Sequence, residues 1–230
     1  MPAWLDAQAW QAIGLTLKLA SLTTLLLLAL ATPLAWWLAQ KRSTLRTAIE
    51  SLVAMPLVLP PTVLGFYLLI AFAPQSAFGV FWQQLTGQAL AFSFEALVIG
   101  SILYSLPFVV QPLQAAFQQI PCGLLEAAST LGAAPIDRWF SVVLPLCRRS
   151  FFAAASLGFA HTVGEFGVVL MIGGNIPGET KVAAIAVYDE VESMNYAAAN
   201  SYSLVLFILT FLILLLVYLF NDGHFKRFWL

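Results

Sequence analysis

The chain has 230 residues, of which 61% are hydrophobic and only 9% are charged, and its formal net charge at pH 7 is −1. A mean hydropathy of +0.89 exceeds that of ordinary soluble domains, so the composition predicts a membrane protein. The balanced charge gives no reason to expect nucleic acid as a partner, and two cysteines cannot build a disulfide framework.

Long runs without charge predict the membrane-spanning segments, because crossing the hydrocarbon core takes roughly 20 apolar residues. No residue between Glu50 and Glu95 is charged, and two later stretches are equally free of charge. The first apolar segment lacks the basic start and the small-residue cleavage site of a secretory signal peptide, so we expect it to be retained. The five expected spans cover residues 12–39, 50–73, 94–118, 149–173 and 197–220.

The positions of the basic residues predict the orientation, because lysine and arginine are retained on the cytoplasmic side of a membrane. With the N-terminus outside and the C-terminus in the cytoplasm, every basic residue except Lys18 and Lys181 falls on the cytoplasmic side. The cytoplasmic basic residues are then Lys41, Arg42, Arg46, Arg138, Arg148, Arg149, Lys226 and Arg227. The segment between the third and fourth spans is therefore expected in the cytoplasm.

Prolines interrupt the second expected span, which reads PLVLPPTVLG from Pro56 to Gly65. An interior proline removes a backbone hydrogen bond and kinks a helix, and broken helix geometry at membrane depth is tolerated only where it faces protein or a water-filled cavity. We expect this span to line a pathway and to bend during gating. A packing kink with no moving part is the alternative.

The cytoplasmic segment at residues 121–141 is predicted to contain two short helices. The stretch PCGLLEAASTLG places leucine and alanine at positions i, i+4 and i+7, which form one apolar stripe of a helix. Gly132 follows where a left-handed cap would end that helix, and Pro135 can start a second one with Asp137 in its first turn. The pair is either a loop lying on the lipid surface or a projection that docks into a groove of a soluble partner.

The fourth expected span carries ionisable side chains at membrane depth. His161 and Glu165 are four residues apart, which places them on one face of a continuous helix. Such residues usually face the bundle interior. They could form a proton relay, a metal site or a structural pair with a neighbouring helix. The structural pair is favoured, because two ligands are too few for a closed zinc site and no duplicated half indicates a secondary transporter; no metal site is expected.

The polar segment that begins at Gly173 is expected on the outer side, with a short surface helix near residues 182–192. The alternative is that this segment is a solvated connector with no binding role.

The chain lacks the G-x-x-x-x-G-K-[ST] phosphate loop and the H-E-x-x-H and G-x-S-x-G motifs. We therefore expect no enzyme, although an intramembrane enzyme using His161 and Glu165 as acid and base is an alternative from another class.

The segment from Glu126 to Pro145 resembles the signature of the membrane subunits of ABC importers. That signature reads E-A-A-x3-G-x9-I-x-L-P, and here only the isoleucine is replaced, by Val142. The resemblance implies that residues 121–141 form coupling helices, which dock on a cytoplasmic ATPase. The residues implied in this coupling are Glu126, Ala127, Ala128, Leu131, Gly132, Leu144 and Pro145.

Two further stretches resemble molybdate importer permeases within that family: MPLVLPPTVLGFYLL at residues 55–69 and GEFGVVLMIGGNIPGET at residues 164–180. Permeases for tungstate and for sulfate or thiosulfate share the coupling signature and are the alternatives. The resemblance implies an all-α membrane protein with a type I ABC importer permease-like fold, formed by residues 1–230 as one multi-pass domain of the bacterial inner membrane.

The same resemblance implies two cytoplasmic ABC ATPase subunits that hold the ATP and magnesium, and a periplasmic oxyanion-binding protein; no cofactor is expected in this chain. We expect a homodimer, because five spans are too few to enclose a hydrophilic pathway. The candidate pathway and gate residues, from the broken second span and the ionisable part of the fourth, are Pro56, Pro60, Pro61, Thr62, Gly65, His161, Gly164, Glu165 and Gly167. The implied docking residues for the binding protein are Asn175, Asp189, Glu190 and Glu192.

Overall fold

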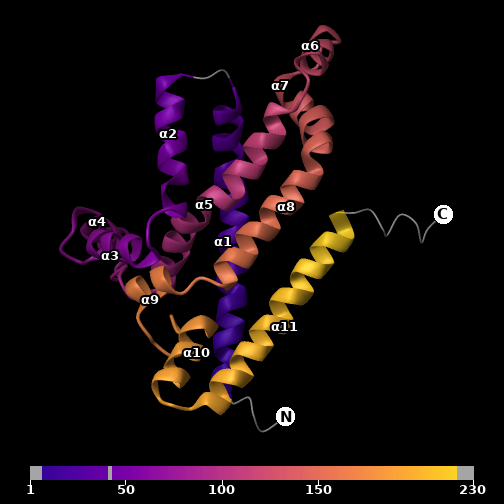
Figure 1. Cartoon of the computed structure of the whole chain (residues 1–230). Coiled ribbons are helices and arrows are strands. Elements are labelled where there is room, and N and C mark those ends of the chain that lie inside the picture. Colours follow the sequence, from indigo (N-terminus) through magenta and orange to yellow (C-terminus); the bar gives the residue numbers. More distant parts are fainter. Residues whose placement is uncertain (1–6, 41–42, 222–230) are drawn as a thin grey trace.

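The computed structural model describes residues 7–40 and 43–221, and within these residues it contains helices and no strand (Figure 1). The α-helices are α1 (Ala7–Ala39), α2 (Thr44–Ala54), α3 (Pro61–Phe72), α4 (Ala77–Thr86), α5 (Phe94–Gln118), α6 (Cys122–Thr130), α7 (Pro135–Arg138), α8 (Leu144–Val163), α9 (Gly167–Gly173), α10 (Ala183–Glu192) and α11 (Tyr196–Asn221). A 3-10 turn at Met55–Leu57 follows α2, and a π-helix at Trp139–Val143 joins α7 to α8.

Among the described residues, four helical segments are long and apolar enough to cross a membrane: Ala7–Ala39, Phe94–Gln118, Pro135–Val163 and Tyr196–Leu219. Together α2 and α3 make a fifth crossing if the bent pair counts as one span. The all-helical membrane fold is therefore confirmed. The orientation stays a prediction, and Lys41, Arg42, Lys226 and Arg227, on which it partly rests, lie outside the described residues.

Helices α1, α5 and α8 pack together as the central bundle (Figure 1). Small residues allow this approach, because helices in lipid associate through tight van der Waals packing rather than through the hydrophobic effect. A Cβ at Gly158 of α8 would lie 2.7 Å from Val109 Cγ2 of α5. On α1, Ala31 and Ala35 are fully buried in the same cluster. In contrast, only 6% of the apolar window of α11 is buried within the chain.

The second span is broken more sharply than the predicted kink. Proline disfavours helical geometry in the residue before it, and Pro60, which precedes Pro61, has an extended backbone with ψ of 134°. As a result α3 turns away from the preceding helix by 110°. Helix α4 then follows, an element that the sequence analysis did not predict, although Ser76 caps its start and Gly87, with φ of 77°, caps its end.

The expectation of one continuous helix over residues 149–173 is wrong. Helix α8 ends at Val163, Gly164 forms its C-cap, and α9 begins only at Gly167. His161 and Glu165 therefore do not share a helical face, because Glu165 lies in the break. At the other end the helical path already begins at Pro135, since the π-helix continues directly from α7 into α8. Packing of α9 against α3, described below, accounts for the break.

At the end of the molecule opposite α6, the first part of α1 packs with α10 and the start of α11 (Figure 1). Ala9, Ala12, Ala186 and Tyr202 form a small buried cluster there. Thr16 Oγ1 accepts a hydrogen bond of 2.8 Å from the backbone N–H of Ala183. This bond joins two segments that are 167 residues apart in sequence.

Replacing Thr16 with valine should lower the free energy of unfolding by about 1–3 kcal/mol, because the buried N–H of Ala183 would lose its acceptor. Thermal unfolding of the purified protein in detergent measures the effect. Thr24→Val is the matched control, because among the described residues the Thr24 hydroxyl donates to Ala20 O of its own helix and accepts from no other segment. An equal loss of stability in both variants would contradict the role given to Thr16.

Candidate functional site

The two helix breaks face each other, because α3 packs along α9. A Cβ at Gly167 would lie 2.8 Å from Pro61 Cβ and 3.6 Å from the Thr62 backbone nitrogen. A Cβ at Gly65 would lie 2.7 Å from Met171 Cβ. Glycine at both positions permits the contact. The structure thus brings together four of the predicted pathway residues from two separate segments of the sequence.

The remaining predicted residues of the second span lie beside this contact. Pro56 belongs to the 3-10 turn, and Pro60 directly precedes α3. The backbone N–H groups of Val58 and Leu59 both donate to Met55 O, so the break keeps its donors satisfied. Val58 itself is 86% exposed. An apolar residue this exposed at a helix break faces lipid, a second protein or a pathway rather than the core of this chain.

His161 contacts the neighbouring helix α5. Its Nδ1 lies 2.8 Å from Ser105 Oγ, within hydrogen-bonding distance. The imidazole ring stacks on Phe108, with ring centroids 3.9 Å apart, and lies 4.8 Å from the ring of Tyr104. Ser105 Oγ also lies 3.2 Å from Thr162 Oγ1. These contacts favour a structural pairing of α8 with α5 over a proton relay.

Glu165 is buried in the break between α8 and α9, with only 4% of its surface exposed. Neither of its carboxyl oxygens has a hydrogen-bond partner of ordinary geometry among the described residues. The hydroxyl of Ser101 on α5, also fully buried, lies beside the carboxyl group and can donate to it. The sequence analysis missed Ser101 and Ser105, although two serines four residues apart in a charge-free span form a helical polar face that could have indicated them.

The segment with the E-A-A motif projects from one end of the bundle (Figure 1). Helix α6 ends in a left-handed turn at Gly132, where φ is 86°. Ala133 N donates to Ala128 O at 3.0 Å, the 6→1 bond of a Schellman cap. Helix α7 starts at Pro135, and Asp137 Oδ2 accepts a hydrogen bond from the backbone N–H of Ala134, the residue before the helix. The predicted helix, glycine turn and second helix are all present.

Apolar side chains are exposed on this projection, which we call the α6–α7 tip (residues 121–140). Leu131 is 88% exposed, and Ile136 and Phe140 are each more than 60% exposed. The Arg138 guanidinium donates a 2.6 Å hydrogen bond to Ser129 Oγ, which fixes α7 against α6. Exposed apolar patches of this kind mark interaction sites. The structure places the motif residues Glu126, Ala127, Ala128, Leu131 and Gly132 in the tip, whereas Leu144 and Pro145 start α8.

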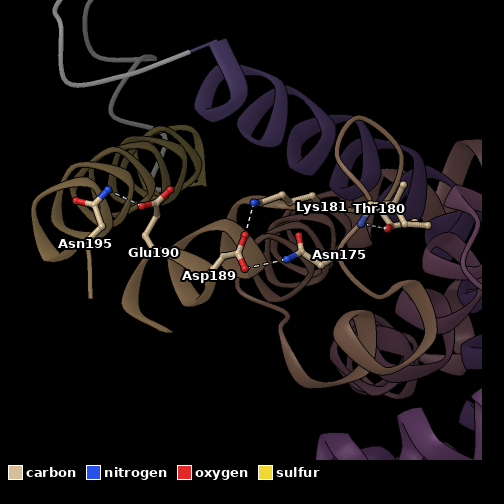
Figure 2. A network of polar contacts seen from close by, with 7 residues as sticks. Asn175, Thr180, Lys181, Asp189, Glu190 and Asn195 are labelled. Atoms are coloured by element: carbon tan, nitrogen blue, oxygen red, sulfur yellow. Dashed lines mark hydrogen bonds and ion pairs between the residues drawn. The ribbon is translucent and has the colours of Figure 1, made fainter. Parts of the chain in front are cut away.

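The predicted docking residues lie on and around α10 and make hydrogen bonds within this segment; Figure 2 shows three of them, Asn175, Asp189 and Glu190. Asp189 forms an ion pair with Lys181 and accepts a 2.9 Å hydrogen bond from Asn175. Glu190 accepts from Asn195 at 2.7 Å, and on the same segment Glu192 accepts from Tyr188 at 2.6 Å. The hydrogen bonds from Lys181 and then Asn175 lower the pKa of Asp189. These acids therefore fix the shape of the segment, in addition to any contact with a partner.

The family described as "Binding-protein-dependent transport system inner membrane component" matches residues 31–229 of the chain. The molybdenum transport system permease protein ModB of Azotobacter vinelandii is 57% identical over 215 residues, which are 94% of each protein. ModB of Escherichia coli strain K12 is 33% identical and covers 80% of both chains. A bacterial ABC transporter that imports the acidic polysaccharide alginate shares the fold, with a TM-score of 0.75 at 17% identity, over 96% of this chain and 80% of that one.

Replacing Gly167 with alanine should reduce the free energy of unfolding by about 1–3 kcal/mol, because the new Cβ would overlap Pro61 and push α9 away from α3. Thermal unfolding in detergent measures the change. Gly14→Ala is the control: no atom lies within 4 Å of a Cβ at that position, and alanine is favoured over glycine inside a helix by up to ~1 kcal/mol. Equal unfolding temperatures for both variants would contradict tight packing between the breaks.

The α10 segment should lose protection in acid. A lowered pKa in the folded state means that the Asp189 contacts contribute stability above the ordinary pKa of an aspartate, and that this contribution disappears as the pH falls through the lowered value. Hydrogen exchange of residues 175–195, corrected for intrinsic rates, measures the protection. Asp189→Asn should show reduced protection already at neutral pH. Glu179→Gln, at an exposed neighbouring position, is the control and should behave as the wild type.

Proposed function

The chain belongs to the family of binding-protein-dependent transport system inner membrane components, and we propose that it forms the translocation pathway of an ATP-driven importer of molybdate. The observation that carries this proposal is the 57% identity to a molybdenum permease over 94% of both chains. Because such identity spans the helix breaks, the α6–α7 tip and α10, it supports a common substrate as well as a common fold. Tungstate and sulfate are the competing oxyanions.

The α6–α7 tip is the surface that we assign to a separate ATPase subunit. Its apolar residues Leu131, Ile136 and Phe140 are exposed at the end of the molecule, where they suit a groove on a soluble partner. The bond from Arg138 to Ser129 and the Schellman cap hold the two short helices at a fixed angle. A tip of fixed shape can pass the movement of an ATPase to α8, with which it is continuous through the π-helix.

The helix breaks are the candidate gate of the pathway. Helices α3 and α9 contact each other through Gly65 and Gly167, and each is connected to the preceding helical segment by a few residues without helical structure. Such junctions absorb changes in φ and ψ while the helices move as units. The exposed face around Val58 is then available to a second copy of the chain, so that two copies enclose the pathway.

The electrostatics favour a weak internal site for the substrate. A tetraoxyanion such as molybdate carries two negative charges, yet the predicted spans contain almost no basic residue besides Lys18, whose Nζ lies 4.4 Å from the centre of the Phe94 ring. Affinity and specificity would then come from a separate binding protein that meets the α10 segment. A permease that binds the ion only weakly would release it readily on the other side.

The α10 end is the candidate contact for that binding protein. Tyr188, Val191, Met194 and Tyr196 each expose more than 40% of their surface there, next to the acidic residues that fix the segment. Aromatic and methionine side chains are enriched at protein interfaces. The ion pair of Lys181 with Asp189 keeps this surface in one shape before the partner arrives.

The central test reconstitutes the chain with its ATPase in liposomes and measures ATP hydrolysis in the presence of candidate binding proteins loaded with molybdate, tungstate or sulfate. We expect the largest stimulation with molybdate. Gly132→Val should abolish the stimulation while the dimer stays in the membrane, because a β-branched residue at φ of 86° strains the turn by about 1–2 kcal/mol.

Gly87→Val is the matched control for Gly132→Val. Gly87 has φ of 77° and, like Gly132, has no atom within 4 Å of the position that a Cβ would occupy, but it caps α4 and lies far from the tip in sequence. It should keep stimulation by the loaded binding protein. Equal stimulation with sulfate and molybdate would overturn the assigned substrate, and full coupling in Gly132→Val would overturn the role of the tip.

A further inference from the structure

Glu165 presents an electrostatic problem that the proposed transport function does not resolve. Only 4% of its surface is exposed, and both carboxyl oxygens lack a hydrogen-bond partner of ordinary geometry among the described residues. An ionised carboxylate in such a site loses its hydration without any replacement, which is strongly unfavourable. Either a positive group compensates the charge or the group carries a proton.

No described positive group faces Glu165. From α5 the neighbouring groups are the Ser101 hydroxyl and, farther away, the Tyr104 phenol. From α8 the nearest titratable group in sequence is His161, whose Nδ1 is engaged with Ser105. The one ion pair found in residues 7–40 and 43–221 joins Lys181 to Asp189, on the α10 segment. Lys18 lies over the ring of Phe94, at the start of α5.

The Ser101 hydroxyl has the complementary deficiency. Ser101 is completely buried, and its Oγ also lacks a partner of ordinary hydrogen-bond geometry. The Ser101 hydroxyl can donate to the carboxyl group in either protonation state, but only a protonated Glu165 can also donate to Ser101 Oγ, and only a protonated Glu165 avoids an uncompensated buried charge. A small rotation of either side chain would complete the bond.

We propose that Glu165 is held as a neutral carboxylic acid at neutral pH and braces the α8–α9 break against Ser101 of α5. The brace fixes the start of α9, the helix that carries Gly167 against Pro61. A neutral acid also leaves no fixed negative charge next to the candidate gate, which an oxyanion would otherwise have to pass. Only this last point rests on the proposed function; the protonation and the brace do not.

The test compares Glu165→Gln with Glu165→Ala in the full chain, purified in lipid nanodiscs at neutral pH. Infrared difference spectra should show the carbonyl band of a protonated carboxyl group in the wild type and its loss in Glu165→Gln. Glutamine reproduces the shape and the donor of the neutral acid, so its melting temperature should stay within about 2 °C of the wild type, whereas Glu165→Ala, which leaves Ser101 unpaired beside a cavity, should melt about 3–10 °C lower.

Glu95→Gln provides the control for the infrared band, because Glu95 is an exposed acid in the first turn of α5. Its replacement should leave the protonated-carboxyl band unchanged. Absence of the band in the wild type, or an equal band in Glu165→Gln, would overturn the proposed protonation. If Glu165→Gln melts as low as Glu165→Ala, or fails to fold, the brace is overturned. Glutamine has the shape and the donor of a neutral glutamic acid, so it should preserve a contact that the neutral acid makes.

A transport assay in the reconstituted complex separates this inference from the proposed function. Molybdate import is measured with the wild-type chain in the complex, whereas the infrared band and the melting temperatures are measured on the purified chain. If the band and the melting temperatures behave as expected but the wild type does not import molybdate, the proposed substrate fails and the brace stands. If the wild type imports molybdate but the protonated-carboxyl band is absent, the neutral brace is overturned and the proposed function stands.

Discussion

The requirement that every buried backbone and polar group be satisfied inside the membrane governs this structure. Water cannot pair with backbone groups in the hydrocarbon, so each interruption of a helix must be covered by protein or must border a cavity. The two interruptions here meet at the contact of Pro61 with Gly167. Because glycine has no side chain, α3 and α9 come close together and Glu165 is buried in its break, whereas Val58 in the other break stays exposed and has to border lipid, a second protein or a pathway.

The same requirement explains how movement can be confined to a few residues. The bundle of α1, α5 and α8 is held by small residues and by the polar contacts of His161, Ser105 and Thr162, which fix helix against helix. In the part of the chain that the structure describes, the side chains of residues 58–60 and 164–166 form no comparable hydrogen bond of ordinary geometry. Helices therefore meet at short junctions, and under the proposed function a force applied at the α6–α7 tip would reach these junctions through α8, with which the tip is continuous.

Much of this arrangement follows from local sequence. Helix α5 begins and ends at the residues predicted from the charge-free run, and Ser93 caps its start. The left-handed turn at Gly132 also lies where the sequence predicted it, directly after the apolar stripe of the first short helix. The end of α8 could not be predicted in this way. The sequence from Gly164 to Gly167 holds two glycines and Glu165, which a continuous membrane helix can also contain, and the break coincides with the packing of α9 against α3, a contact between residues about a hundred positions apart. Helix α4 was missed, although Ser76 and Gly87 are recognisable caps.

The sparse burial of α11 has a consequence for what surrounds the protein. A helix of 26 residues satisfies its own backbone hydrogen bonds and needs no neighbour to lie in a bilayer. Contacts with α8 and α10 hold α11 to the chain, yet little of its apolar window is covered by them. Most of this helix is therefore solvated by lipid or by a second protein, so the composition of its surroundings bears on α11 more than on the central bundle.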